Sequence, residues 1–244
     1  MDKNVAIEIK NVSMCFNMPK EKVDNMKEFF IKFLKKQLHY EEFYALTDVS
    51  LTIDKGEVVG IVGLNGSGKS TLLKIISGIL VPSSGTARTD GTISPLIELG
   101  AGFDFELTTK ENIYLNGSVL GFDRKFIKEK YDEILDFAEL RDFENIAIKN
   151  FSSGMIARLG FAVATLVKPD ILIVDEILAV GDYLFQQKCE KRIFDMMAGG
   201  TTVLIVSHSI DQIERLCSRV IWLEKGRVKK IGETEEICAE YQKR

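Results

Sequence analysis

The stretch that decides the fold is Glu57-Val58-Val59-Gly60-Ile61-Val62-Gly63-Leu64-Asn65-Gly66-Ser67-Gly68-Lys69-Ser70-Thr71. It begins as an apolar β run and ends in the spacing Gly63-x-x-x-x-Gly68-Lys69-Ser70. A helical pattern follows at once, with leucine or isoleucine at positions 72, 73, 75 and 76. A strand, a glycine-rich loop and a helix in this order form the context of a phosphate-binding P-loop. A chance match is disfavoured because both flanking elements are present.

Each residue type in this loop suits phosphate chemistry. Gly63, Gly66 and Gly68 allow backbone N–H groups to turn inward around a phosphate chain. The helix that begins near Lys69 points its positive end at the same phosphates. Lys69 supplies a charge for the β- and γ-phosphates, and Ser70 supplies a hydroxyl for Mg²⁺. We therefore predict that a nucleotide binds to Gly63, Leu64, Asn65, Gly66, Ser67, Gly68, Lys69, Ser70 and Thr71.

Composition and charge narrow the class of protein. The chain has 244 residues, of which 45% are hydrophobic and 28% charged, as in ordinary globular proteins with a core of their own. A net charge of −4 gives no general attraction to nucleic acid. The scattered cysteines have no metal or redox spacing, so we expect reduced thiols of a cytosolic protein. Neither a signal peptide nor an apolar run of bilayer length is recognisable, so we expect no membrane span.

The order of patterns along the chain predicts an α/β fold with two additions. Strands are expected at 5–16, 45–53, 58–62, 86–88, 92–97, 170–175 and 202–207, and a hairpin at 219–230 that turns at 224–227. Helices are expected at 111–120, 124–137, 153–167 and 234–242. The helices between about 109 and 168 are expected to form a lobe inserted into the α/β core. A second insertion, about residues 20–44, separates the first two strands.

The insertion contains an amphipathic pattern at residues 22–39. Apolar residues recur at helical spacing on one side, while lysines and acidic residues fill the other. The segment Phe29–Lys36 is also locally basic. Two interpretations stay open. The helix either packs its apolar side on its own domain, or it contacts a membrane surface or a partner protein.

A second chemical element follows the buried strand near residue 171. Asp175 ends a continuous apolar run, which is typical of a parallel strand covered on both faces. At that position Asp175 would hold Mg²⁺ directly or through water, and Glu176 would polarise a water against the γ-phosphate. His208 follows the next such strand. A lone histidine at a strand end is usually structural, so a functional role for His208 is favoured only by the other motifs.

The order of these motifs resembles the nucleotide-binding domain of ABC transporters over essentially the whole chain. The series is the P-loop, Phe151-Ser152-Ser153-Gly154-Met155, Asp175-Glu176, Gly181-Asp182 and His208. The resemblance implies one domain over residues 1–244, with a RecA-like P-loop NTPase core, an antiparallel β subdomain and the inserted helical lobe. It also implies an ATPase with ATP and Mg²⁺ as cofactors, working as a homodimer in which each signature segment closes on the partner's ATP.

The same resemblance implies roles for individual residues. Glu176, His208 and Lys69 would be catalytic, and Ser70, Asp175 and Glu98 would surround the metal. Ser152, Ser153 and Gly154 belong to the signature segment, which is also a serine- and glycine-rich helix start suited to an anion. Further contacts to ATP would come from Asp182, from Glu98, and from Phe16 stacking on adenine, with Tyr44 as the alternative aromatic residue.

Departures from the family pattern point to one subfamily. Ser153 and Met155 replace the usual glycine and glutamine of the signature, and Glu98 stands where most members have glutamine. These departures occur together with the segments 98–103, 111–117 and 175–182. As a set they resemble the ATP-binding subunits of polysaccharide exporters, such as teichoic acid and lipid-linked O-antigen transporters. This resemblance implies a peripheral protein at the cytoplasmic face of the cell membrane. Its partners would be separate membrane permease subunits and a lipid-linked polysaccharide as substrate.

One detail refines that expectation, and two alternative functions compete with it. Some O-antigen exporters carry an additional C-terminal sugar-binding domain. This sequence ends at Arg244 without one, so we expect the teichoic acid type or an exporter without a sugar-recognition tail. A soluble ABC-type ATPase acting on nucleic acid or ribosomes would be expected to carry a second ATP domain, a coiled coil or a basic arm, and none is recognisable. A non-catalytic scaffold would lack Lys69, Glu176 or His208. We therefore expect no nucleic acid partner, and a subunit for another solute is the alternative within the family.

Overall fold

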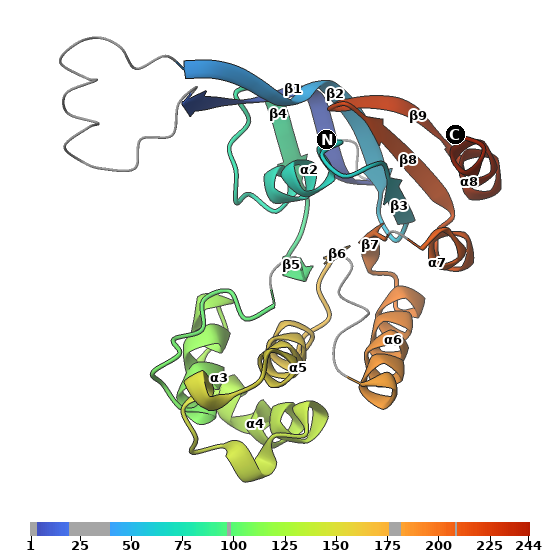
Figure 1. Cartoon of the computed structure of the whole chain (residues 1–244). Helices are drawn as coiled ribbons and strands as arrows, with labels where there is room; N and C mark the ends of the chain where they lie inside the picture. Colours follow the sequence, from blue (N-terminus) through green and yellow to red (C-terminus); the bar gives the residue numbers. More distant parts are fainter. Residues whose placement is uncertain (1–3, 20–39, 97–98, 176–181, 208) are drawn as a thin grey trace, which may run out of the picture.

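The computed structural model describes residues 4–19, 40–96, 99–175, 182–207 and 209–244. Two sheets and a group of helices make up this part of the chain (Figure 1). In chain order the elements are β1 (Val5–Pro19), β2 (Tyr40–Asp54), β3 (Val58–Val62), α2 (Lys69–Ile76), β4 (Ser84–Thr89), β5 (Ile93–Leu96), α3 (Thr109–Val119), α4 (Arg124–Ala138), η1 (Arg141–Phe143), η2 (Ile148–Asn150), α5 (Ser153–Ala164), β6 (Ile171–Asp175), α6 (Tyr183–Ala198), β7 (Thr202–Val206), α7 (Ile210–Leu216), β8 (Arg219–Glu224), β9 (Arg227–Glu233) and α8 (Thr234–Gln242).

The larger sheet places β3 near its centre. Its strand order is β5-β6-β7-β3-β8-β9, with parallel pairing from β5 to β8 and an antiparallel edge strand β9. Such mixed sheets, with an antiparallel edge on a parallel sheet, are common in α/β proteins. The glycine-rich loop therefore leaves the sheet from a strand that is held on both sides.

The smaller sheet is antiparallel, with the order β2-β1-β4. Helix α2 lies between it and the larger sheet (Figure 1). A buried apolar cluster joins the two sheets through α2 and includes Ile7, Leu46, Ile61, Leu72 and Leu204. The start of α2, and with it Lys69, is thus fixed by packing on two sides.

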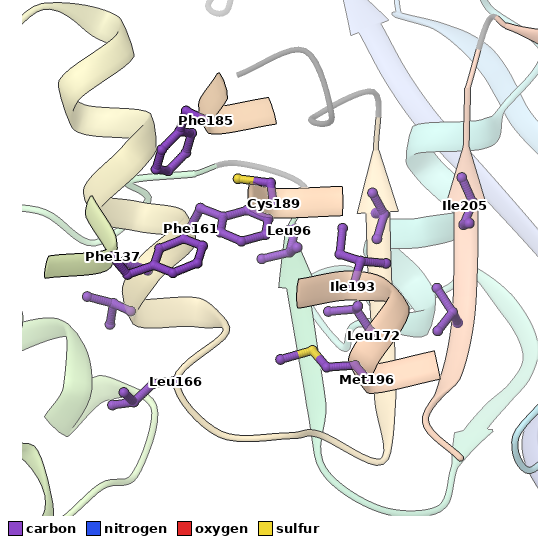
Figure 2. Packing of buried hydrophobic residues seen from close by; sticks show 14 of the residues in the cluster. Leu96, Phe137, Phe161, Leu166, Leu172, Phe185, Cys189, Ile193, Met196 and Ile205 are labelled. Carbon is purple, nitrogen blue, oxygen red and sulfur yellow. The ribbon is translucent and has the colours of Figure 1, made fainter. Parts of the chain in front are cut away.

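Helices α3, α4 and α5 lie at the other end of the molecule from β1 and β2 (Figure 1). A second apolar cluster joins them to the larger sheet through α6 (Figure 2). At its centre Phe137 of α4, Phe161 of α5 and Phe185 of α6 contact one another, with ring centroids 5.7–6.5 Å apart. Such aromatic contacts stabilise a packed core beyond the area they bury.

Several sequence predictions agree closely with the described elements. The hairpin turns at residues 224–227 and the last helix covers 234–242, as expected. The third lobe helix ends at Ala164, not at residue 167. There Thr165 is the C-cap with non-helical backbone angles, φ −105° and ψ 15°, and its hydroxyl donates to the Phe161 carbonyl at 2.7 Å. Every helix among the described residues is too short or too polar to span a bilayer.

The prediction for the second strand was wrong at its start. The strand begins at Tyr40 and not at Ala45, so residues 40–44 belong to the sheet and not to the insertion. They pair with residues 15–19 of β1 and lengthen the ladder, because aromatic residues such as Phe43 and Tyr44 favour strands. The amphipathic helix predicted at residues 22–39 lies outside the described residues.

Two helices, α6 and α7, were not predicted from the sequence. The signal for α6 is nevertheless present, because Phe185, Cys189, Ile193 and Met196 recur at helical spacing. All four side chains are buried in the cluster shown in Figure 2. Asp182 caps the start of this helix by accepting a hydrogen bond from the Phe185 N–H at 3.0 Å.

Candidate functional site

The loop between β3 and α2 has a shape that only glycine permits at its last position. Gly68 is the N-cap of α2 with φ 102°, a backbone conformation that L side chains rarely adopt. A Cβ atom there would lie 2.7 Å from both the Ala45 carbonyl oxygen and the Leu46 Cδ2 atom. The loop and the start of α2 are therefore pressed against β2. The first N–H groups of α2 are left to face an anion in the loop.

Lys69 is held inside the loop. The residue is 8% exposed, and its Nζ donates to the carbonyl oxygens of Gly63 at 2.7 Å and Leu64 at 3.2 Å. Hydrogen bonds from an ammonium group to charged oxygens are stronger than those to neutral carbonyls. Phosphate oxygens entering the loop would therefore compete for this ammonium group, as the predicted role of Lys69 requires.

A cavity of about 330 Å³ opens on the loop, within the size range of ligand pockets. Nine residues line it: Phe43, Ala45, Asn65, Gly66, Ser67, Gly68, Lys69, Ser70 and Thr71. Seven of these are predicted nucleotide contacts. Of the other two residues predicted in this loop, Leu64 lines a smaller cavity between the loop and the β8–β9 turn, and Gly63 supports Lys69 through its carbonyl. The structure thus brings most of the predicted phosphate contacts to one hollow.

The aromatic residue at this cavity is Phe43, which the sequence analysis missed. Phe43 is 49% exposed and lies two residues before Ala45 on β2, so both face the cavity. Phe16 pairs with Phe43 across the β1–β2 ladder and packs against the core between the sheets. The Tyr44 hydroxyl donates to Glu42 at 3.0 Å. Neither Phe16 nor Tyr44 is among the residues that line the cavity.

Asp175 lies on the same edge of the larger sheet as the loop. It is the last residue of β6 and pairs with Val206 of β7, the strand next to β3. Carboxyl ends of parallel strands meet at one edge, so Asp175 at the end of β6 lies on the edge from which the loop leaves β3 toward Ser70 at the start of α2, although Asp175 is not among the residues that line the cavity. Hydroxyl and carboxylate oxygens are ligands that Mg²⁺ accepts, and this donor set fits that ion. Glu98, Glu176 and His208 lie outside the described residues, so their predicted roles stay predictions.

The predicted signature residues lie apart from this cavity. Ser152 is the N-cap of α5, and its hydroxyl accepts a hydrogen bond from the Met155 N–H at 3.3 Å. Ser153 is exposed, and a Cβ atom on Gly154 would meet only the Ser152 hydroxyl, at 3.8 Å. The helix start is thus open to solvent. None of the three residues lines the cavity on the loop, and Figure 1 shows α5 in the helical lobe, well away from α2.

Asp182 also lies apart from the cavity, where it joins two helices. Its Oδ1 atom caps α6, and its Oδ2 atom forms an ion pair with Arg158 of α5. The Phe185 backbone N–H, with a further contribution from Arg158, holds the pKa of this carboxyl below its usual range. Asp182 is therefore a carboxylate in the folded protein at neutral pH.

A second loop supports the phosphate loop from behind. The Gly226 N–H, in the β8–β9 turn, donates to the Ser67 carbonyl at 3.0 Å. The Gly226 carbonyl accepts from the Thr47 N–H at 2.8 Å. These two bonds tie the loop to β2 through the hairpin turn. The sequence predicted this turn but not its contact with the loop.

Comparison with known proteins gives a consistent result. The ABC transporter family matches residues 46–179. The O-antigen export system ATP-binding protein RfbB of Klebsiella pneumoniae is 46% identical over 201 residues, 82% of each chain. The teichoic acids export ATP-binding protein TagH of Staphylococcus saprophyticus is 40% identical over 240 residues, covering 98% of this chain and 89% of that protein.

Solved structures agree with the fold. The ATP-binding cassette MJ0796, in a dimeric post-hydrolysis state bound to ADP and Pi, superposes with a TM-score of 0.73 at 25% identity over 93% of this chain and 98% of that one. An ATP-binding subunit of an ABC transporter gives a TM-score of 0.75 at 24% identity, over 97% and 93% of the two chains. The predicted fold class, a P-loop NTPase with an antiparallel β sheet and a helical lobe, is confirmed. This chain belongs to the ABC transporter family.

Proposed function

We propose that this chain is the ATP-hydrolysing subunit of an exporter of a lipid-linked cell-surface polysaccharide, either teichoic acid or an O-antigen-like polymer. The cavity on the glycine-rich loop, with Lys69 buried at its base, carries the nucleotide assignment. Family membership agrees with an ATPase. The substrate class rests on 40–46% identity to proteins named for O-antigen and teichoic acid export.

Different residues bind the phosphates, hold Mg²⁺ and activate the attacking water. Backbone N–H groups of residues 63–71 and Lys69 hold the phosphates, and Phe43, which lines the same cavity, stacks on the adenine base. Ser70, Asp175 and Glu98 are the proposed holders of Mg²⁺, which neutralises charge on the phosphates when bound. Glu176 takes a proton from the attacking water, and His208 donates a hydrogen bond toward the γ-phosphate.

The separation of the signature residues from the cavity supports a homodimer. Ser152, Ser153 and Gly154 stand at an open helix start that suits an anion, yet they do not reach the phosphate loop of their own chain. A second copy, facing head to tail, brings them onto its partner's ATP. The dimer docks on separate membrane permease subunits at the cytoplasmic face of the membrane, and no nucleic acid takes part.

Two experiments test these proposals separately. Glu176→Gln should retain ATP binding and lose steady-state hydrolysis, whereas normal turnover would contradict the role of Glu176. For the substrate, the protein is depleted in its own host and the lipid-linked glycans on the cytoplasmic side are analysed by mass spectrometry. Accumulation of one lipid-linked polymer identifies the substrate. Failure of another solute to move, without such accumulation, would keep the ATPase and refute polysaccharide export.

A further inference from the structure

Arg158 joins the helix that carries the signature residues to the helix that Asp182 caps. Its Nη1 atom donates to Glu139 Oε2 at 2.6 Å, and its Nη2 atom forms an ion pair with Asp182. The guanidinium lies 4.8 Å from the ring centroid of Phe185, a cation–π contact. We propose that Arg158 is a positioning residue that keeps the start of α5 in register with the start of α6.

The two oxygens of Asp182 have different partners, which makes the connection specific. Oδ1 accepts from the Phe185 N–H and so begins α6, while Oδ2 faces Arg158. Arg158 is the sixth residue after the Ser152 cap, about 9 Å along the helix axis. One carboxylate thus fixes the first turn of α6 to the first half of α5.

The other side of Arg158 is fixed by the end of α4. Glu139 is the C-cap of α4. Lys188 of α6 donates to the Phe137 carbonyl at 2.8 Å and approaches Glu139 at 3.4 Å. Figure 2 shows Phe185 and Phe137 close to Phe161 in one aromatic group. Three helices therefore converge on the guanidinium, and its planar fork suits two carboxylates at once.

We expect the Arg158 contacts to fix the position of α5 relative to α6 and to contribute little to the stability of the fold. Glu139 and Asp182 are 51% and 59% exposed, so both carboxylates stay hydrated if Arg158 is removed. The Arg158 side chain is only 18% exposed, so Arg158→Ala also loses packing against Phe185, but pairs with hydrated carboxylates contribute little to folding and the aromatic group continues to hold the three helices together. What is lost is the alignment of Ser152 and its neighbours with Asp182.

The functional consequence rests on the proposed homodimeric ATPase. Asp182 lies seven residues after Asp175, and Ser152 begins the surface that would close on the partner's ATP. If these elements shift by even 1 Å, hydrolysis is expected to fall about 10- to 100-fold. Nucleotide binding by the loop between β3 and α2 is expected to remain, because Arg158 does not line that cavity.

A matched control is available on the same lobe. Arg141 also pairs with two carboxylates, Asp132 at 2.9 Å and Asp136 at 2.7 Å. Both partners belong to α4, and Arg141 is 52% exposed. Arg141→Ala removes the same charge and the same number of ion pairs without disconnecting α5 from α6.

The test compares Arg158→Ala, Arg158→Lys and Arg141→Ala in the full chain. Amide hydrogen exchange is followed at Met155 in α5 and at Phe185 in α6, together with mant-ATP affinity and kcat. Arg158→Ala should speed exchange at both helix starts and lower kcat about 10- to 100-fold, with affinity within about twofold. Arg158→Lys, which lacks the fork, should fall between the wild type and Arg158→Ala. Arg141→Ala should match the wild type.

Each other outcome has a distinct meaning. Unchanged exchange at Met155 and Phe185 in Arg158→Ala overturns the proposal, and so does an equal loss of kcat in Arg141→Ala. If Arg158→Ala does not fold, wild-type exchange and kcat in Arg158→Lys overturn it. A wild-type protein that binds no ATP would refute the proposed function instead, because the exchange measurement does not depend on hydrolysis.

Discussion

Two glycines of the phosphate loop have similar backbone strain but different surroundings. Gly66 has φ 77° and Gly68 has φ 102°, so alanine is disfavoured at both. A Cβ atom on Gly66 would meet nothing within 4 Å. On Gly68 it would lie 2.7 Å from the Ala45 carbonyl oxygen, which is backbone and cannot rotate away. Alanine substitutions at these two sites therefore separate backbone strain from steric overlap.

The magnitudes follow from these contacts. A non-glycine residue in the left-handed region costs about 1–2 kcal/mol, which is the full effect expected for Gly66→Ala. Gly68→Ala adds overpacking against Ala45 and Leu46, which typically costs about 1–3 kcal/mol. Gly68→Ala should thus lower the free energy of unfolding by about 2–5 kcal/mol in all. The difference between the two variants is the steric overlap alone.

Urea unfolding measures this difference. With a slope of about 2–3 kcal/mol per molar urea, the midpoint of Gly68→Ala should lie about 0.3–1.5 M below that of Gly66→Ala. Equal midpoints would refute the reasoning, because the Ala45 carbonyl and the Leu46 methyl group would then have moved aside at no cost.

The ATP affinity of these variants should not follow their stability. Gly66 lines the cavity, and its added methyl group would meet no protein atom and would occupy space next to the phosphates. Gly66→Ala should therefore bind ATP more weakly than the wild type, even though it loses less stability than Gly68→Ala.

Three further predictions concern other parts of the chain. Phe43→Ala should weaken mant-ATP binding about tenfold, since stacking on a base is worth about 1–3 kcal/mol, while Tyr44→Ala should bind as the wild type does; equal losses would contradict the assignment. Burial raises the pKa of the Cys217 thiol to about 12, so iodoacetamide at pH 8 should label it only after unfolding, and rapid labelling of the native protein would oppose this packing. Hydrogen bonds from the N–H and hydroxyl of Thr108 lower the pKa of Glu111 below its usual 4.5. The resulting stability is present above pH 4.5 and lost as pH falls through the lowered pKa, so the melting temperature of Glu111→Gln should depend less on acid than that of the wild type.

Local signals explain why much of the site was predictable. The strand, loop and helix around Lys69 are contiguous, and each is specified by its own residues. The β8–β9 turn is equally local, since Lys225 and Gly226 both have positive φ, as a two-residue hairpin turn demands. By contrast, Arg158 and Asp182 are 24 residues apart, and nothing in their sequence surroundings indicates that they meet. Their contact depends on how α4, α5 and α6 pack.

The error at the start of β2 shows how a strand boundary decides a binding site. Residues 40–44 were assigned to the insertion, and they include Phe43, the aromatic residue at the cavity. A strand lengthened to Tyr40 carries Phe43 and Ala45 on one face, because alternate residues share a face. The Ala45 carbonyl oxygen would lie 2.7 Å from a Cβ atom on either Gly68 or Gly226. One peptide group of β2 therefore restricts both the phosphate loop and the turn that supports it to glycine at these positions. The aromatic residue and the phosphate loop are thus positioned by the same strand. A change in β1–β2 register would move Phe43 relative to the phosphates without altering any residue of the glycine-rich motif.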